Sequence, residues 1–197
     1  MTPIDPDLIA VVSGLPRSGT SLMMKMLDAG GLSPLTDHIR SADEDNPQGY
    51  YEFERVKKLK EDRDWLPEAK GKAVKVISAL LTRLPAGYEY RVIFMRRNMS
   101  EILASQRQML IRRGEPVDTA NDADMAALFA RHLQQVETWL AGQPNMRVLY
   151  VNYNELVKAP LAHAQRVNEF LGGRLDVARM AGAVDPNLHR QRSDRLL

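Results

Sequence analysis

A short polar segment near the start of the chain has the residue types of an oxyanion site. It runs from Ser13 to Ser21 as Ser-Gly-Leu-Pro-Arg-Ser-Gly-Thr-Ser, with its two glycines five positions apart. Glycine lets the backbone approach an anion closely, and the N–H groups that open a following helix attract negative charge. Arg17 adds a planar guanidinium that can donate two hydrogen bonds to one oxyanion. We therefore predict that this segment binds a phosphate-like group.

The residue at position 20 distinguishes this segment from the phosphate loops of nucleotide triphosphatases. Those loops carry a lysine that reaches the terminal phosphates, whereas this chain has Thr20. The apolar run 8–12 before the segment predicts a buried strand, and the run 22–27 after it predicts a helix. An ordinary strand-turn-helix junction is the alternative, but the order of strand, arginine, hydroxyls and helix favours an altered phosphate loop.

A second candidate anion site follows the run 91–95, which predicts another buried strand. Arg97 lies between this strand and a predicted helix, and Ser105 follows eight residues later. The alternative is a solvated arginine and a serine on the helix surface. Further along, Tyr153 follows the strand-like run 147–151, where an aromatic residue serves either a ligand or the packing of the core.

These segments resemble those of sulfotransferases that use 3′-phosphoadenosine 5′-phosphosulfate as the sulfuryl donor. The first is similar to their 5′-phosphosulfate loop, especially in tyrosylprotein sulfotransferases and small bacterial relatives, and the matches together span residues 8–172. The resemblance implies that Arg97 and Ser105 bind the 3′-phosphate and that Tyr153 supports the adenine. It also implies a loop that holds the 5′-phosphosulfate, made of Pro16, Arg17, Ser18, Gly19, Thr20 and Ser21.

The resemblance implies the fold as well: α/β, with a parallel sheet like that of P-loop NTPases flanked by helices on both faces. The length suits a single sulfotransferase-like P-loop domain over residues 1–197, and alternating strand-like and helix-like runs suit a parallel sheet. We also predict a helix over residues 50–65, after the turn sequence Asn-Pro-Gln-Gly, and a helix with a core-facing side over 128–140.

Composition limits the partners and the compartment. The net charge is +2, which does not predict a nucleic-acid groove. The chain has no cysteine, no apolar run of about 18 residues and no recognisable signal peptide, so we expect a cytoplasmic protein that does not enter a membrane. This would separate it from the membrane-anchored sulfotransferases that its first segment resembles.

A sulfuryl donor already carries its reactive group. The enzyme must therefore hold the donor, stabilise charge on the departing oxygen and remove a proton from the acceptor. Arg17 is the candidate for stabilising that charge, with Thr20 and Ser21 assisting through hydrogen bonds. The transferred sulfuryl group has less negative charge than a terminal phosphoryl group, for which magnesium is central. With threonine in place of the loop lysine, we expect no metal ion.

The residue that removes the acceptor proton is less well defined. Resemblance to cytosolic sulfotransferases would place a histidine where this chain has Ile77, so that base is absent. Resemblance to the tyrosylprotein branch implies a glutamate base, whose position, counted without gaps from Arg17, falls on His38. The preceding Asp37 is itself a candidate base, or would orient His38. A histidine is chemically suited, with an ordinary pKa near 6.5. Glu52, in the segment Asn-Pro-Gln-Gly-Tyr-Tyr-Glu, is a reserve candidate, and a polar loop without a catalytic part is the alternative.

Two other functions remain open from the sequence. A P-loop kinase or nucleotide hydrolase would share the fold, although Thr20 argues against it. A catalytically inactive nucleotide-binding protein would keep the loop and lack the base. The acceptor, a hydroxyl or amine on a small molecule or a peptide, is not specified, and neither is the oligomeric state. A nucleotide contact is also undetermined for the C-terminal Arg190, Arg192 and Arg195.

Overall fold

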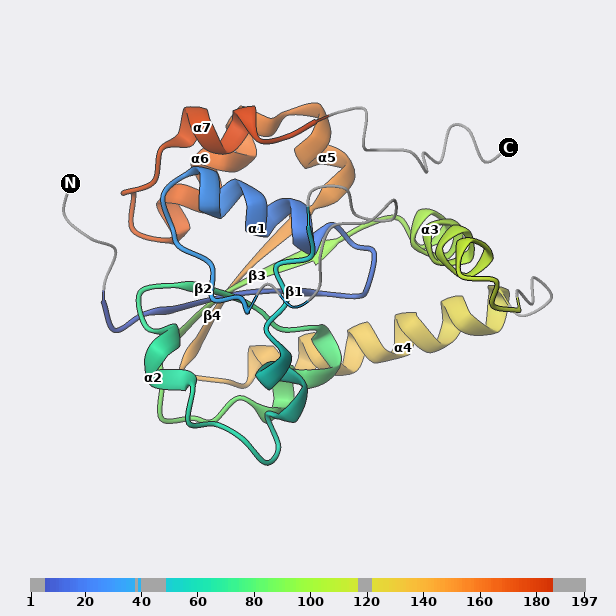
Figure 1. Ribbon diagram of the computed structural model, residues 1–197, viewed down its shortest axis with the longest axis horizontal. Coiled ribbons are helices and arrows are strands. Elements are labelled where there is room, and N and C mark those ends of the chain that lie inside the picture. The colour runs from blue at the N-terminus through green and yellow to red at the C-terminus, as the bar shows by residue number, and fades with distance from the viewer. Residues whose placement is uncertain (1–5, 38, 40–48, 117–121, 186–197) are drawn as a thin grey trace.

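A computed structural model of the chain describes residues 6–37, 39, 49–116 and 122–185. The described part is built around a parallel sheet of four strands in the order β2-β1-β3-β4 (Figure 1). The strands are β1 (Ile9–Gly14), β2 (Ala73–Lys75), β3 (Tyr90–Arg96) and β4 (Met146–Asn152). The helices are α1 (Thr20–Ala29), α2 (Leu66–Ala69), α3 (Met99–Arg112), α4 (Asp122–Ala141), α5 (Tyr153–Lys158), α6 (Pro160–Phe170) and α7 (Val177–Gly182), with 3-10 turns η1 (Glu54–Lys58) and η2 (Ser78–Arg83).

The strand register brings the ends of all four strands to one edge of the sheet. β1 lies between β2 and β3, and its Val12 pairs with Lys75 on one side and Ile93 on the other. Every residue of β1 is buried, as expected for a central parallel strand covered on both faces. The chain passes from β1 to β2 and then returns to β3 on the opposite side of β1. In such open sheets, ligands bind beyond the carboxyl ends of the strands at this reversal.

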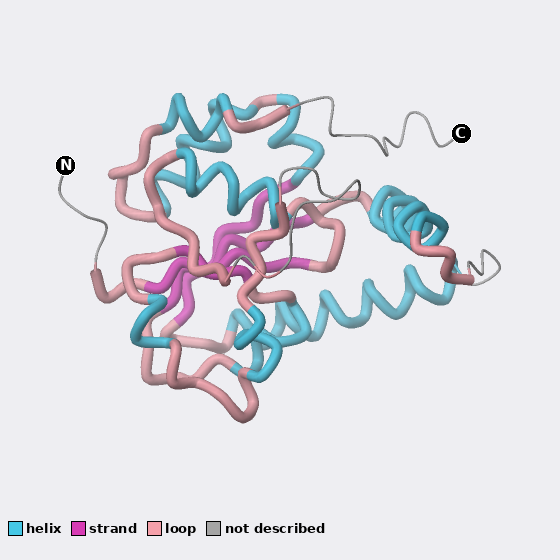
Figure 2. The backbone as a smooth tube through the Cα atoms, in the orientation of Figure 1, coloured by secondary structure: helices cyan, strands magenta, loops and turns pink. Residues whose placement is uncertain are grey.

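Helices cover both faces of the sheet (Figures 1 and 2). α1, α6 and α7 lie on one face, and α2, α4 and η2 lie on the other. Alternate residues of β1 serve the two layers, because Val12 belongs to the first core and Val11 to the second. The first core includes Met23, Leu27, Val151, Val167 and Met180, and the second includes Trp65, Leu81, Phe94, Val136 and Leu140. The predicted α/β fold, with a parallel sheet between two helical layers, is confirmed.

Residues 50–65 do not form the continuous helix that we predicted, and that prediction is wrong. Tyr51 has a φ angle of +52°, which an α-helix excludes, and η1 covers only one short turn of the segment. The chain instead folds back on itself, where Arg55 Nε lies 2.7 Å from Asp62 Oδ2. Trp65 is fully buried in the second core as a result. Burial of its large ring outweighs the local helix propensity.

The predicted helix over 128–140 is confirmed, and it forms most of α4. Its core contact comes from the C-terminal end, where Val136 and Leu140 are buried. α3 and the other end of α4 extend beyond the sheet (Figure 1). None of the helices in the described ranges combines the length and the apolar character that crossing a membrane requires.

Candidate anion-binding and active site

The predicted anion-binding loop connects β1 to α1 at the carboxyl edge of the sheet. α1 begins at Thr20, and the preceding Gly19 has a φ angle of +100°, where glycine is favoured. No side chain caps this end of α1, and its first turn contains no acidic residue. Its opening N–H groups are therefore suited to an anionic ligand. Arg17 is also left-handed, with a φ angle of +69°, a strained conformation that is concentrated at functional sites.

Two buried hydroxyl groups lie in this loop region without a hydrogen-bond partner among the described residues. They belong to Ser13, at the end of β1, and to Ser18. A Cβ atom added to Gly14 would lie 2.5 Å from the Ser18 hydroxyl and 2.6 Å from the carbonyl oxygen of Met95. Only glycine therefore lets the loop pass this close to the end of β3. Unsatisfied buried polar groups cost free energy, so their presence here favours a binding role for the loop.

The two predicted anion sites are brought together. Arg17 Nε donates a hydrogen bond of 2.9 Å to Ser105 Oγ, which comes from the buried side of α3. Arg97 Nη1 donates to the carbonyl oxygen of Arg17 at 3.1 Å. Residues 88 and 80 positions apart in sequence thus meet at one place. The surface alternative for Arg97 and Ser105 is wrong, because the Arg97 side chain is 8% exposed and Ser105 is buried.

Tyr153 lies between the loop and Arg97. It is the first residue of α5, it is buried, and the guanidinium of Arg97 lies 4.4 Å from its ring centroid. A Cβ atom added to Gly19 would lie 2.4 Å from Tyr153 Cδ2. The phenol ring is therefore part of the first core and also packs directly against the anion-binding loop. The structure thus shows the packing role of Tyr153, and its role in binding a ligand stays a prediction.

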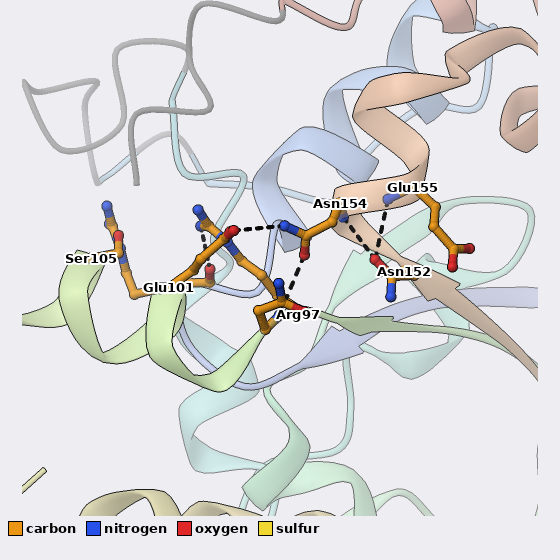
Figure 3. Close-up of polar contacts among 8 residues, drawn as sticks. Arg97, Glu101, Ser105, Asn152, Asn154 and Glu155 are labelled. Carbon is orange, nitrogen blue, oxygen red and sulfur yellow. Dashed lines mark hydrogen bonds and ion pairs between the residues drawn. The ribbon is translucent and has the colours of Figure 1, made fainter. Parts of the chain in front are cut away.

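Two residues of this region were missed in the sequence. Glu101 is fully buried, with Oε2 accepting from Arg97 Nε at 2.9 Å and Oε1 accepting from Asn154 Nδ2 at 2.8 Å (Figure 3). Asn154 follows Tyr153 at the start of α5, where Asn152 caps the helix by accepting from the backbone N–H of Asn154 at 2.8 Å. The available signal was the short spacing of four residues from arginine to glutamate across the start of a predicted helix, since Arg97 lies just before α3 and Glu101 lies in its first turn.

A second cation reaches the loop from β2. Lys75 Nζ donates to Ser21 Oγ at 3.3 Å and to the carbonyl oxygen of Tyr50 at 3.0 Å. Its ammonium lies 3.8 Å from Glu52 Oε1, and the two side chains are 10% and 20% exposed. Glu52 thus lies beside the anion-binding loop. Ile77, which stands where a histidine was sought, is 38% exposed.

The carboxylate of Asp37 is engaged by the backbone. Its Oδ2 accepts from the N–H of Glu54 at 2.6 Å, and its Oδ1 accepts from the N–H of Ile39 at 3.1 Å. The backbone N–H of Asp37 in turn donates to the carbonyl oxygen of Glu52 at 3.4 Å. Asp37 therefore ties its own loop to the segment that carries Glu52. His38, the other predicted base, lies outside the described residues, as do Arg190, Arg192 and Arg195.

The remaining predicted loop residues lie in the turn after β1 and in the first turn of α1. Pro16 is exposed on its outer side, Thr20 is buried at the start of α1, and Ser21 is half-buried. Across the described ranges, no three histidine, cysteine or acidic side chains cluster as ligands of a metal ion would. The expectation of a metal-free reaction stays a prediction.

Comparison with known proteins identifies the relatives of this architecture. The described chain is similar to a sulfotransferase domain from the Synechococcus olefin synthase, with 18% identity, a TM-score of 0.55, and coverage of 98% of this chain and 86% of that one. A sulfotransferase from Mycobacterium tuberculosis gives 16% identity, a TM-score of 0.56, and coverage of 92% and 71%. One from Alicyclobacillus acidocaldarius gives 14% identity, a TM-score of 0.51, and coverage of 98% of both chains. At these identities the likeness shows the fold.

Comparison of sequences identifies the family. No curated protein sequence matches significantly. A sequence model of the sulfotransferase family matches residues 50–176, which is more than half of the chain. The match excludes the loop between β1 and α1, so it is independent of the motif that first suggested the resemblance. It includes the segments that supply Glu52, Lys75, Arg97, Ser105 and Tyr153. The chain therefore belongs to the sulfotransferase family.

Proposed function

We propose that this sulfotransferase takes its sulfuryl group from 3′-phosphoadenosine 5′-phosphosulfate and transfers it to a hydroxyl or amine acceptor. The observation that carries the proposal is the meeting of Arg17, Arg97 and Ser105 at the uncapped start of α1. One donor with two separate anionic groups suits a site in which two cationic segments lie side by side. The product would be 3′-phosphoadenosine 5′-phosphate.

The 5′-phosphosulfate would lie against the opening N–H groups of α1. Thr20 and Ser21 would hydrogen-bond to its oxygens, with Pro16, Ser18 and Gly19 shaping the turn. Arg17 would stabilise the negative charge that develops on the bridging oxygen as the sulfur–oxygen bond breaks. Lys75 adds a second positive charge at Ser21, 3.3 Å from its hydroxyl.

The 3′-phosphate would lie against Arg97 and Ser105, and the adenine against Tyr153. A guanidinium provides five N–H donors in one plane and suits a phosphate. Tyr153 is buried against Gly19 and beneath the guanidinium of Arg97, so it would support the adenine by holding the loop and Arg97 beside it.

Glu52 is the base that the geometry favours. In the transfer, the acceptor oxygen or nitrogen gives its proton to the base and forms a bond to sulfur. The bond between sulfur and the bridging oxygen breaks, and that oxygen leaves on the 5′-phosphate of the nucleotide. The Glu52 carboxylate lies beside Lys75, which contacts the loop that would hold the reacting group. Asp37 is less suited, because both of its oxygens accept backbone N–H groups. Asp37 then supports the position of Glu52, and His38 stays a candidate.

The acceptor would be a small molecule or a peptide, and the oligomeric state is undetermined. Cytoplasmic location, a single domain over residues 1–197 and the absence of nucleic-acid and membrane partners stay predictions. Family membership argues against the kinase or nucleotide hydrolase alternative. A catalytically inactive nucleotide-binding protein would bind the donor without transferring its sulfuryl group to any acceptor.

Calorimetry with two nucleotides tests the donor assignment. 3′-Phosphoadenosine 5′-phosphate should bind ten- to hundredfold more tightly than AMP, because charge-assisted hydrogen bonds to the 3′-phosphate contribute about 1.5–3 kcal/mol. Arg97→Ala should abolish the preference. Arg96→Ala is the matched control, since this neighbouring arginine pairs with Glu137 away from the loop. Equal affinity of the wild-type protein for both nucleotides would refute the assignment, and transfer from radiolabelled donor to a panel of acceptors tests catalysis.

A further inference from the structure

A buried negative charge lies next to the proposed phosphate-binding arginine. Glu101 is fully buried, and no other acidic side chain in the described ranges is buried. Burying a carboxylate is costly unless hydrogen bonds and an opposite charge compensate it. Its carboxylate contacts Arg97, so it also reduces the positive charge that a phosphate would meet.

The contacts of Glu101 join two helices across the site. One carboxylate oxygen accepts from Arg97 Nε at 2.9 Å, and the other accepts from Asn154 Nδ2 at 2.8 Å. The backbone N–H of Asn98 approaches Asn154 Oδ1 at 3.4 Å. The start of α3 is thereby linked to the start of α5, and Figure 3 shows Glu101 between Arg97 and Asn154.

This link fixes the plane of the Arg97 guanidinium. Glu101 holds Nε, the carbonyl oxygen of Arg17 holds Nη1, and the Tyr153 ring lies 4.4 Å from the guanidinium carbon. A planar guanidinium held at three places has a fixed position and a fixed plane. Without these contacts, the long arginine side chain would lose rotamer entropy when it binds a phosphate, and this loss would weaken binding.

We infer that Glu101 and Asn154 are positioning residues that orient Arg97 and thereby make the site select nucleotides with a 3′-phosphate. The inference rests on the proposed function, because it takes the 3′-phosphate as the group that Arg97 binds. The two residues act through Arg97 and need no contact with the donor.

Glu101→Gln separates positioning from simple charge, because the two effects have opposite signs. Removing a negative charge beside Arg97 should strengthen phosphate binding if charge alone matters. Removing the ion pair that orients Arg97 should weaken it. We expect the affinity for 3′-phosphoadenosine 5′-phosphate to fall about tenfold, with AMP affinity within about twofold of wild type. The matched control, Glu137→Gln, removes the carboxylate that pairs with the exposed neighbour Arg96 and should leave both affinities unchanged.

Calorimetry on the full chain gives results that decide the inference. An unchanged or higher affinity of Glu101→Gln for the 3′-phosphorylated nucleotide would overturn it. An equal loss of affinity for both nucleotides would also overturn it, because that pattern indicates a merely structural role. Asn154→Ala retains the ion pair, so it serves if Glu101→Gln does not fold, and it should give a smaller selective loss. If wild type itself does not prefer the 3′-phosphorylated nucleotide, the donor assignment fails instead.

Discussion

Substitution of Gly19 by alanine tests the contact between the anion-binding loop and Tyr153. Gly19 has a φ angle of +100°, and its added Cβ would lie 2.4 Å from Tyr153 Cδ2 and 3.1 Å from Cε2. Real Cβ atoms do not approach ring carbons that closely, so the loop or the ring must move. Gly31 is a matched control, with a φ angle of +96° and no atom within 4 Å of its added Cβ.

The expected free energies follow from these two environments. Both alanines would adopt a left-handed conformation, which costs about 1–2 kcal/mol. Gly19→Ala also overpacks the core, which costs about 1–3 kcal/mol more. For a domain of this length, 1 kcal/mol corresponds to about 2–4 °C in Tm. Gly31→Ala should therefore lower Tm by about 2–8 °C, and Gly19→Ala should lower it further.

Nucleotide binding gives the second readout. Displacement of the Tyr153 ring should also displace Arg97, which lies over it, and should weaken binding of 3′-phosphoadenosine 5′-phosphate by about 10- to 150-fold, because charge-assisted hydrogen bonds contribute about 1.5–3 kcal/mol. Gly31→Ala should leave the affinity unchanged. Differential scanning calorimetry and titration calorimetry measure the two quantities. Equal Tm values for the two variants, with wild-type affinity in Gly19→Ala, would refute the close contact and the adenine-supporting role together.

Three further predictions concern catalysis and pH. Arg17→Ala should lower kcat more than it weakens binding of the product nucleotide, because its charge acts mainly in the transition state; equal losses would make it a binding residue. Glu52→Gln should lower transfer by about 10²–10⁴-fold without changing nucleotide affinity, whereas Asp37→Asn should mainly lower Tm; the reverse pattern would move the base to Asp37. Burial, with a smaller contribution from Arg166, lowers the pKa of His163. The unfolded chain then takes up a proton first, so stability should fall as the pH drops below about 6.5, and His163→Gln should flatten that dependence in urea titrations.

The meeting of the residues proposed to hold the donor could be predicted from the sequence because these residues follow strand ends. Arg97 and the loop around Arg17 each come directly after a buried strand, and parallel strands bring such positions to one edge. Glu101 could not be predicted in the same way. Its importance depends on Asn154, which is 53 residues away and reaches it only through the junction of β4 and α5.

The acceptor half was harder to predict because it depends on irregular segments. An ungapped count from Arg17 selected His38 and Asp37, but backbone pairing brings Glu52 beside residues 36 and 37. Thr36 Oγ1 and the N–H of Asp37 both donate to the carbonyl oxygen of Glu52. This pairing holds the Glu52 backbone against residues 36 and 37. No periodic pattern encodes such a contact. The predicted helix over 50–65 failed because the local sequence does not show that Trp65 is buried in the second core.

The two carboxylate–cation pairs beside the loop, Glu101 with Arg97 and Glu52 with Lys75, differ in burial, which supports different roles for them. Glu101 is fully buried, 2.9 Å from Arg97 Nε, and both of its oxygens accept hydrogen bonds. Such a carboxylate cannot exchange a proton with an acceptor without losing the contacts that hold it. Glu52 lies 3.8 Å from Lys75 Nζ, and its side chain is 20% exposed. A more accessible carboxylate can accept a proton from an incoming hydroxyl. The difference in burial therefore supports the proposals that Glu101 orients the arginine at the 3′-phosphate and that Glu52 is the base at the sulfuryl group.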